Sequence, residues 1–185
     1  GKSTLVAGLA VYLTFFCKEP GADGYAMATT REQARIVWQT AQAMLRALPE
    51  LCKGAGIEVE QHAIFQTSSN SSFKALSSDY NTLDGLNPQV AVIDELHVVQ
   101  RGLYDIIETA MQKREQPILL SISTAGFDTS SIGHELYTYG RGILEGVRDD
   151  DRFFILIFES DTEDVLDETG WAQANPNLGV SVKVA

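Results

Sequence analysis

Apolar and polar positions follow one another in blocks that predict alternating helices and strands. Residues 3–16 are apolar on all sides and stop before Pro20, as expected of a buried helix with a firm end. Residues 89–93 form a continuous apolar run between Pro88 and Asp94, which is typical of a buried parallel strand. This rhythm predicts an α/β domain with a mostly parallel sheet that helices cover on both faces.

Shorter patterns predict the remaining elements. Further strands are expected over residues 24–28, 57–59, 63–65, 117–122 and 153–158. Further helices are expected over residues 34–48, 104–113 and 132–147. Thr30 is expected to cap the first of these helices, with Gln33 as its capping-box partner. The length of 185 residues suits one domain with a substantial core.

The charge balance limits the kinds of partner that the surface can hold. Fourteen Lys and Arg against 25 Asp and Glu give a net charge of −11. This excess argues against a broad basic face for nucleic acid, but not against a motor that touches DNA through one loop. The longest apolar stretch, residues 5–17, contains Gly8, Tyr12 and Thr14 and is too short for a membrane span. We therefore expect no membrane association.

The sequence opens on Gly1-Lys2-Ser3-Thr4, directly ahead of a predicted helix. In a phosphate-binding loop, glycine lets the backbone approach the nucleotide, lysine reaches the β and γ phosphates, and a hydroxyl binds Mg²⁺. These residues match the end of the motif G-x-x-x-x-G-K-[ST], whose first glycine is not in the sequence, so we expect the chain to be part of a longer protein. Alone, four residues can also stand at a helix start by chance.

Two carboxylates, Asp94 and Glu95, follow the apolar strand at residues 89–93. At the C-terminal edge of a parallel sheet both can reach a ligand in the crevice beyond it. One carboxylate then holds Mg²⁺, and the next acts as general base on the attacking water. The alternative is an acidic turn after a core strand.

Small polar residues follow the next buried strand, in Ser121-Ile122-Ser123-Thr124-Ala125-Gly126. In a parallel sheet, the hydroxyl of Ser123 or Thr124 would lie close to the γ-phosphate and sense its presence. The alternative is a turn that only caps the strand.

Taken in order, these motifs resemble the ATPase domain of the large terminase subunit of tailed phages. The resemblance extends to four further segments, Ala28–Ala34, Asp84–Pro88, Leu96-His97 and Trp171–Gly179. It implies a Walker A motif at Gly1, Lys2, Ser3 and Thr4, with Ser3 also a Mg²⁺ ligand. It further implies a Walker B aspartate at Asp94, which binds Mg²⁺, a catalytic glutamate at Glu95 and a coupling motif at Ser123 and Thr124.

The resemblance also implies the fold and the biology. The fold is a three-layer P-loop NTPase of the ASCE or RecA-like type, with the ATPase core at residues 1–160. Residues 161–185 would lead toward a nuclease domain, so the full-length protein would also be an endonuclease. The cofactors are ATP and Mg²⁺, and the activity drives viral DNA into capsids in the host cytoplasm. The implied partners are double-stranded DNA, the portal, the small terminase subunit and further copies in a ring.

Two other functions stay open from the residues alone. A helicase core of the DEAD/DEAH type has similar motifs to Asp94-Glu95-Leu96-His97 and Thr29-Thr30-Arg31-Glu32, and loosely to Ser123-Thr124-Ala125. Against it, Thr29 stands where the helicase motif has proline. A non-catalytic nucleotide switch would have little use for Glu95 beside Asp94.

Two polar residues near these motifs have competing interpretations. Arg114 precedes the strand at residues 117–122. One interpretation is that its positive charge stabilises the phosphates bound by a neighbouring subunit. The other is that it forms a surface salt bridge with Glu115 or Glu108. His97 is expected to pack beside the carboxylates rather than to bind metal.

Overall fold

The computed structural model describes residues 1–76, 85–162, 164, 166–180 and 183, without the side chain of Arg31. Asp84, which contributes to the terminase resemblance, lies outside the described residues. Contacts divide the chain into two compact units, Lys2–Tyr137 and Thr138–Ala185, and Gly1 groups with the second. The division falls inside a helix, α5.

A six-stranded sheet forms the centre of the unit Lys2–Tyr137 and has the order β2-β3-β4-β1-β5-β6. The strands are β1 (Asp23–Met27), β2 (Ile57–Val59), β3 (Ala63–Gln66), β4 (Ser71–Ala75), β5 (Pro88–Ile93) and β6 (Ile118–Ser121). The pairings β4–β1, β1–β5 and β5–β6 are parallel, while β2–β3 and β3–β4 are antiparallel. The predicted α/β fold with a mostly parallel sheet is confirmed.

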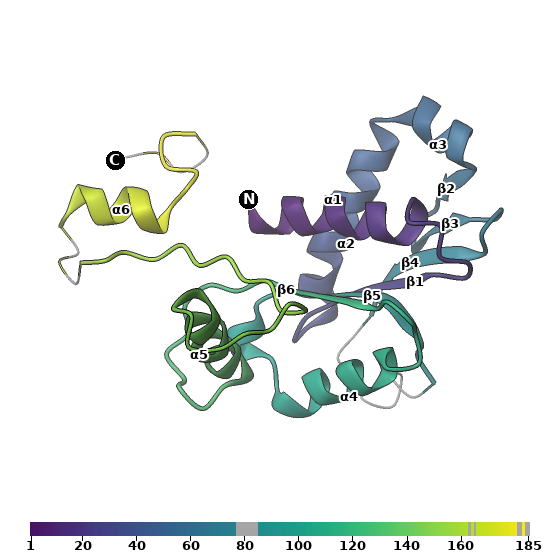
Figure 1. Ribbon diagram of the computed structural model, residues 1–185. Coiled ribbons are helices and arrows are strands. Elements are labelled where there is room, and N and C mark those ends of the chain that lie inside the picture. The colour runs from purple at the N-terminus through teal and green to yellow at the C-terminus, as the bar shows by residue number, and fades with distance from the viewer. Residues whose placement is uncertain (77–84, 163, 165, 181–182, 184–185) are drawn as a thin grey trace. The chain divides into compact units, whose positions relative to one another are not determined.

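Helices cover both faces of this sheet (Figure 1). The helices are α1 (Lys2–Phe15), α2 (Arg31–Arg46), α3 (Pro49–Ala55), α4 (Arg101–Met111), α5 (Ile132–Leu144), α6 (Glu168–Ala174) and a 3₁₀ turn, η2 (Leu96–Val98). Helices α1 and α2 pack on one face, and α4 packs on the other. The result is three layers, helix–sheet–helix.

Alternate residues of β5 point apolar side chains to both faces of the sheet, so both faces must be covered by helices. Val90 and Val92 pack into the cluster under α1 and α2, whereas Ala91 and Ile93 pack into the cluster under α4. All four are fully buried, as the continuous apolar run predicts for a strand between two layers. On the first face, Trp38 Nε1 also donates a hydrogen bond to the carbonyl of Phe73, 3.3 Å away.

The start of α2 follows the sequence prediction only in part. Thr30 caps the helix, because its hydroxyl accepts a hydrogen bond from the Gln33 N–H at 3.2 Å. The side-chain oxygen of Gln33 accepts a short hydrogen bond from Thr29 Oγ1, at 2.6 Å, and a longer one from Thr30 Oγ1, at 3.4 Å. Helix α2 ends at Arg46, and a separate helix that was not predicted, α3, begins at Pro49. Proline is suited to the first position of a helix, because the N–H that it lacks would have no partner within the helix there.

The predicted strand at residues 153–158 is wrong. In the unit Thr138–Ala185 these residues are extended but form no strand. One side faces α5, where the rings of Phe153 and Tyr139 meet edge to face at 5.1 Å. The opposite side exposes Phe154, Leu156 and Phe158. The alternation that predicted a strand therefore reflects packing of one side against a helix, not hydrogen bonding in a sheet.

Candidate functional site

Three of the parallel strands, β1, β5 and β6, bring the polar motifs to one edge of the sheet. Their registers place Met27 beside Ile93 and Ile93 beside Ser121. The residues that follow each strand therefore emerge at the same C-terminal edge, where α/β sheets bind ligands. Asp94 and Glu95 follow one of these strands directly.

Asp94 is the buried carboxylate of this edge, with 6% of its surface exposed. Its N–H donates to the carbonyl of Met27 at 2.9 Å, and its Oδ1 accepts from the Glu95 N–H at 2.8 Å. Burial raises the pKa of the Asp94 carboxyl, and the negative charge of Glu95 adds to the rise. Three groups lower the same pKa: the Glu95 N–H, the charge of Lys2 and the side chain of Ser3. The first residues of α1 thus lie beside Asp94.

The residues that meet here suit a phosphate and a divalent cation. Lys2 and Ser3 are the first residues of α1, so they stand where the helix presents unpaired N–H groups and the positive end of its dipole. The Ser3 hydroxyl and the Asp94 carboxylate are hard oxygen donors, which Mg²⁺ prefers. Gly1 and Thr4 flank them in sequence and are both exposed. The predicted nucleotide-binding and metal-binding residues are therefore compatible with a Mg²⁺–nucleotide complex.

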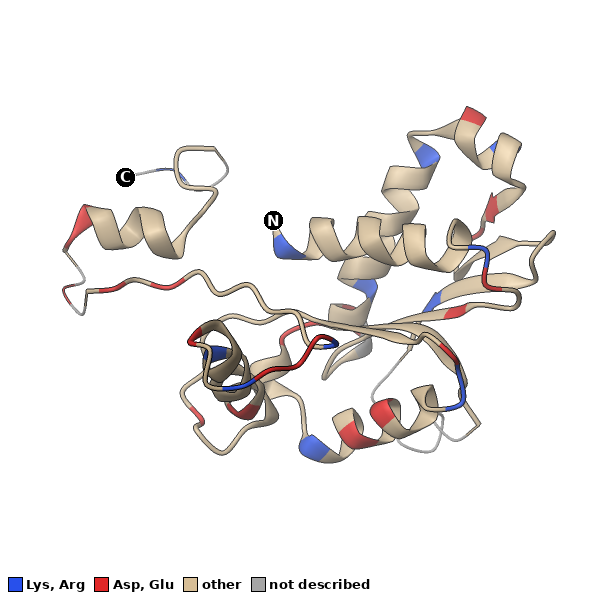
Figure 2. Cartoon of the chain, in the orientation of Figure 1, with Lys and Arg blue, Asp and Glu red and all other residues tan. Residues whose placement is uncertain are grey.

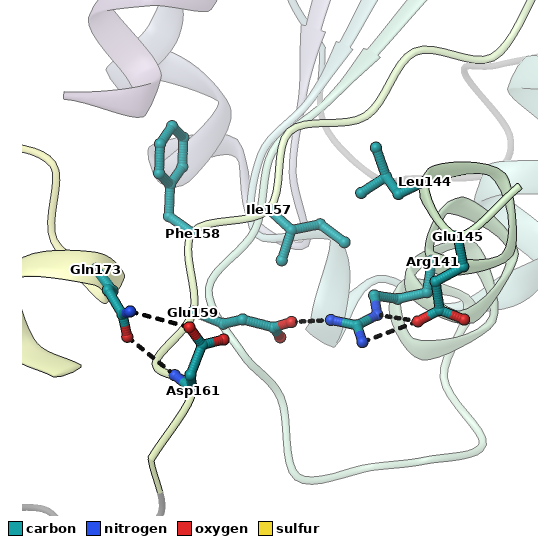
Figure 3. Close-up of a pocket in the computed structure, with 8 residues that line it drawn as sticks. All are labelled: Arg141, Leu144, Glu145, Ile157, Phe158, Glu159, Asp161 and Gln173. Carbon is teal, nitrogen blue, oxygen red and sulfur yellow. Dashed lines mark hydrogen bonds and ion pairs between the residues drawn. The ribbon is translucent and has the colours of Figure 1, made fainter.

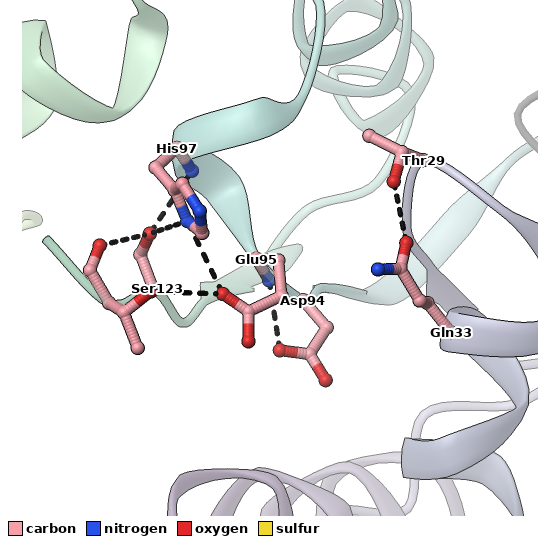
Figure 4. A network of polar contacts seen from close by, with 7 residues as sticks. Thr29, Gln33, Asp94, Glu95, His97 and Ser123 are labelled. Atoms are coloured by element: carbon pink, nitrogen blue, oxygen red, sulfur yellow. Dashed lines mark hydrogen bonds and ion pairs between the residues drawn. The ribbon is translucent and has the colours of Figure 1, made fainter. Parts of the chain in front are cut away.

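Glu95 has an unusual backbone conformation at the same edge. Its φ of 53° and ψ of 51° place it in the left-handed region, which for a residue with a side chain costs on the order of 1–2 kcal/mol. Glu95 then begins the short turn η2, and its Oε2 lies 3.3 Å from both Thr124 Oγ1 and His97 Nδ1 (Figure 4). Glu95 and Thr124, predicted as base and coupling residue, are thus in contact.

Ser123 lies beside His97, a contact that sequence reasoning missed. The Ser123 Oγ lies 3.0 Å from both the backbone nitrogen and the Nδ1 of His97. It is also 2.8 Å from the carbonyl of Thr124, to which it can donate (Figure 4). Ser123 therefore contacts the turn after Asp94 and Glu95 but neither carboxylate directly.

Thr29 and Gln33 extend the polar edge beyond β1. Thr29 follows that strand, and its hydroxyl donates to Gln33 Oε1 (Figure 4). With its oxygen held by this bond, the Gln33 amide group points its nitrogen toward the side on which Asp94 and Glu95 lie. Both residues belong to the Ala28–Ala34 segment of the terminase resemblance. Gln33 was interpreted only as a capping residue, so its position at this polar edge was not predicted.

Arg114 lies at the opposite edge of the sheet and is held in place there. Its Nη2 donates to the carbonyl of Gly21 at 2.6 Å, its Nε donates to the carbonyl of Asn87 at 3.1 Å, and its Nη1 is 3.8 Å from Glu19. With 13% of its side chain exposed, the guanidinium joins the loops that enter β1, β5 and β6. The expected salt bridge with Glu115 or Glu108 is wrong, because the carboxylate beside Arg114 is that of Glu19. These contacts within the chain favour a structural role for Arg114 over action on a neighbour's phosphates.

Basic residues are spread along the chain (Figure 2). They lie on several helices and loops, where acidic residues are more numerous. Within the described residues, no helix is both long and apolar enough to cross a membrane.

A separate hollow of about 350 Å³ lies in the unit Thr138–Ala185 (Figure 3). Arg141, which lines it, forms ion pairs with Glu145 and Glu159. Gln173 of α6 bonds Asp161 across the same hollow, with 2.9 Å between Nε2 and Oδ2. Since two carboxylates already surround the arginine, this hollow is a poor site for a phosphate, and none of the predicted site residues lines it.

A three-layer α/β fold of this kind is that of a P-loop nucleoside-triphosphate hydrolase. The chain belongs to the family described as "Terminase large subunit, ATPase domain", whose sequence profile matches residues 1–142. This membership supports the terminase interpretation over the helicase and implies ATP hydrolysis.

Individual relatives agree with the family. The chain is 29% identical to the terminase large subunit of Enterobacteria phage HK97 over 185 residues, which covers 97% of this chain and 36% of the relative. It is 36% identical over 104 residues to Protein YmfN of Escherichia coli K12, covering 54% of this chain and 22% of that protein. The chain thus spans about a third or less of the curated relatives it matches.

Solved structures share the fold. The crystal structure of the HK97 large terminase matches with a TM-score of 0.80 at 27% identity, covering 97% of this chain and 37% of that one. The large terminase ATPase domain of Thermus phage P74-26 matches with a TM-score of 0.56 at 22% identity, covering 69% of this chain and 57% of that one. The second likeness supports the fold alone.

Proposed function

We propose that this chain is the ATP-hydrolysing motor region of a terminase large subunit that drives viral DNA into a capsid. The observation that carries the proposal is the position of Lys2 and Ser3 beside the buried Asp94, with Glu95 next to it. Four residues from two distant segments thereby supply a phosphate-binding cation, two metal ligands and a candidate base.

Each residue has a proposed role in hydrolysis. Lys2 contacts the β and γ phosphates from the start of α1, and Gly1, Ser3 and Thr4 complete the nucleotide-binding residues. Ser3 and Asp94 hold Mg²⁺, which supplies charge neutralisation to the phosphates when bound. Glu95 accepts a proton from the attacking water. Ser123 and Thr124 couple phosphate release to movement of the strand ends.

The contacts of Glu95 support the assignment of base rather than metal ligand. Its Oε2 contacts Thr124 and His97, whereas Asp94 Oδ1 accepts from the Glu95 N–H and the pKa of the Asp94 carboxyl is influenced by Lys2 and Ser3. The two neighbouring carboxylates are therefore directed to different partners. This difference supports Asp94 as the metal ligand and Glu95 as the group that acts on the water.

The wider biology of the protein is also part of the proposal. Double-stranded DNA would be the moved substrate, and the portal, the small terminase subunit and further copies in a ring would be the partners, in the host cytoplasm. We assign residues 1–160 to the ATPase core and residues 161–185 to a segment leading toward a nuclease domain, which would make the full-length protein an endonuclease as well. The net charge of −11 indicates that contact with DNA is confined to a small part of the surface.

Phosphate release by the full-length protein tests the proposed site. Lys2→Ala should abolish both ATP binding and turnover, because the lysine carries the positive charge nearest the β and γ phosphates. Lys53→Ala is the matched control, since Lys53 is an exposed lysine on α3. Normal turnover by Lys2→Ala would rule out this site as the place of hydrolysis.

The movement along DNA requires its own measurement. A motor on double-stranded DNA should displace the third strand of a triplex in an ATP-dependent reaction while leaving the duplex paired. Separation of the duplex strands would instead support the helicase function.

A further inference from the structure

Glu95 and Ser123 contact the His97 ring from two sides. The turn η2 returns the chain so that the His97 ring approaches the Glu95 carboxylate, at 3.3 Å between Nδ1 and Oε2. Ser123 lies on another side of the same ring, 3.0 Å from Nδ1. The ring nitrogen thus stands between the candidate base and the candidate coupling residue (Figure 4).

The hydrogen-bond donors determine the direction of these contacts. An ionised carboxylate only accepts, so a bond to Glu95 requires that His97 Nδ1 carries the proton. The Ser123 hydroxyl can donate to the carbonyl of Thr124 while its oxygen accepts from the His97 N–H. Its second lone pair then also accepts from Nδ1–H, which is shared between Ser123 and Glu95. This assignment gives the His97 N–H, the His97 Nδ1–H and the Ser123 hydroxyl each a partner.

Two glycines allow the following loop to lie directly on His97. A Cβ at Gly126 would lie 2.8 Å from the Cβ of His97, and a Cβ at Gly133 would lie 3.0 Å from its Cα and 3.2 Å from its nitrogen. A side chain at Gly126 would displace the His97 side chain, and one at Gly133 would press on the His97 backbone. The loop from residue 124 into the start of α5 therefore packs directly on His97.

We propose that His97 is a positioning residue that holds the carboxylate of Glu95 in its productive place and transmits to it the position of the loop at residues 124–133. The proposal rests on the proposed function, in which Glu95 is the base. Because carboxylates are efficient bases only in a narrow geometry, a small displacement of the ring should change turnover and leave nucleotide binding intact.

Kinetics of His97 variants in the full-length protein test this role. His97→Leu keeps the bulk but removes the donor, so kcat should fall about 10- to 100-fold, as for other residues that orient a reacting group, with KM for ATP unchanged. His97→Asn restores an N–H near the position of Nδ1 and should recover most of the loss. Equal losses for both variants, or full kcat in His97→Leu, would overturn the proposal.

The loop contact is tested with paired glycines. Gly133→Ala should lower kcat in the same way, whereas Gly54→Ala should not, because a Cβ at Gly54 on α3 meets nothing within 4 Å. Thermal melts of both show whether the fold is kept. If Gly133→Ala is folded and has normal kcat, the loop does not act through His97. Ser123→Ala, which removes the oxygen that holds Nδ1, is the replacement test if His97→Leu does not fold.

A double-mutant cycle separates this proposal from the one on which it rests. If His97 acts through Glu95, His97→Leu should cause no further loss of kcat in a Glu95→Gln background. An additional full loss there would show that His97 acts elsewhere. Near-normal turnover by Glu95→Gln alone would instead remove Glu95 as the base, and the His97 variants would then have to be explained without it.

Discussion

The hydroxyl of Thr124 lies 3.3 Å from the carboxylate of Glu95, although the two residues are 29 positions apart in the chain. The contact joins the end of β6 to the end of β5. A shift of one strand end relative to the other therefore changes the surroundings of the candidate base. The proposed coupling role of Thr124 rests on this contact.

Thr124→Ala should lower turnover or DNA translocation while leaving nucleotide affinity close to its original value. A single hydrogen bond worth about 1 kcal/mol changes a rate roughly fivefold. Thr124→Ser keeps the hydroxyl and is the matched control. Steady-state hydrolysis and equilibrium nucleotide binding measure the two quantities separately. A large loss of ATP affinity in Thr124→Ala would make Thr124 a ligand of bound ATP rather than a coupling residue.

Arg114→Lys should destabilise the fold and leave kcat per folded molecule unchanged. Lysine cannot reach the carbonyls of Gly21 and Asn87 together, because it lacks the planar fork of the guanidinium. Loss of hydrogen bonds to a charged group should lower the free energy of unfolding by roughly 1–3 kcal/mol. Chemical denaturation measures this, with the exposed Arg46→Lys as control. Unchanged stability would contradict the bridging role.

Ile107→Ala should destabilise the protein far more than Ile36→Ala. Both are helical isoleucines, but Ile107 on α4 is fully buried against the sheet and Ile36 on α2 is 51% exposed. Removing a buried isoleucine side chain costs about 2–5 kcal/mol. Denaturant unfolding of the two variants compares them directly. Similar small losses for both would contradict the three-layer packing in which α4 covers the second face of the sheet.

The central strands were predictable because each carries its own signal. The apolar run of β5 contains four residues that are buried on alternating faces, so its pattern alone identified a strand covered on both sides. The acidic pair after it was equally clear. These features are patterns within short stretches of the chain, so they can be recognised from the sequence alone.

The place of His97 beside Glu95 was expected from the sequence, but its contact with Ser123 and the contacts of Arg114 were not predictable, because they join distant segments. Arg114 bonds the carbonyl of Gly21, 93 residues away, and backbone carbonyls carry no sequence signature. The alternation at residues 153–158 was read as a strand, but the same pattern arises when an extended segment lies on a helix. Periodicity reports which side is buried and not what buries it.

The most direct test of the account is the separation of ATP binding from ATP hydrolysis in Glu95→Gln of the full-length protein. The amide keeps the size of the side chain but cannot accept the proton of the attacking water. We expect nucleotide affinity near that of the wild type with turnover lower by at least roughly 10²-fold, the low end for acid–base catalysis. Turnover close to the wild-type rate would contradict it.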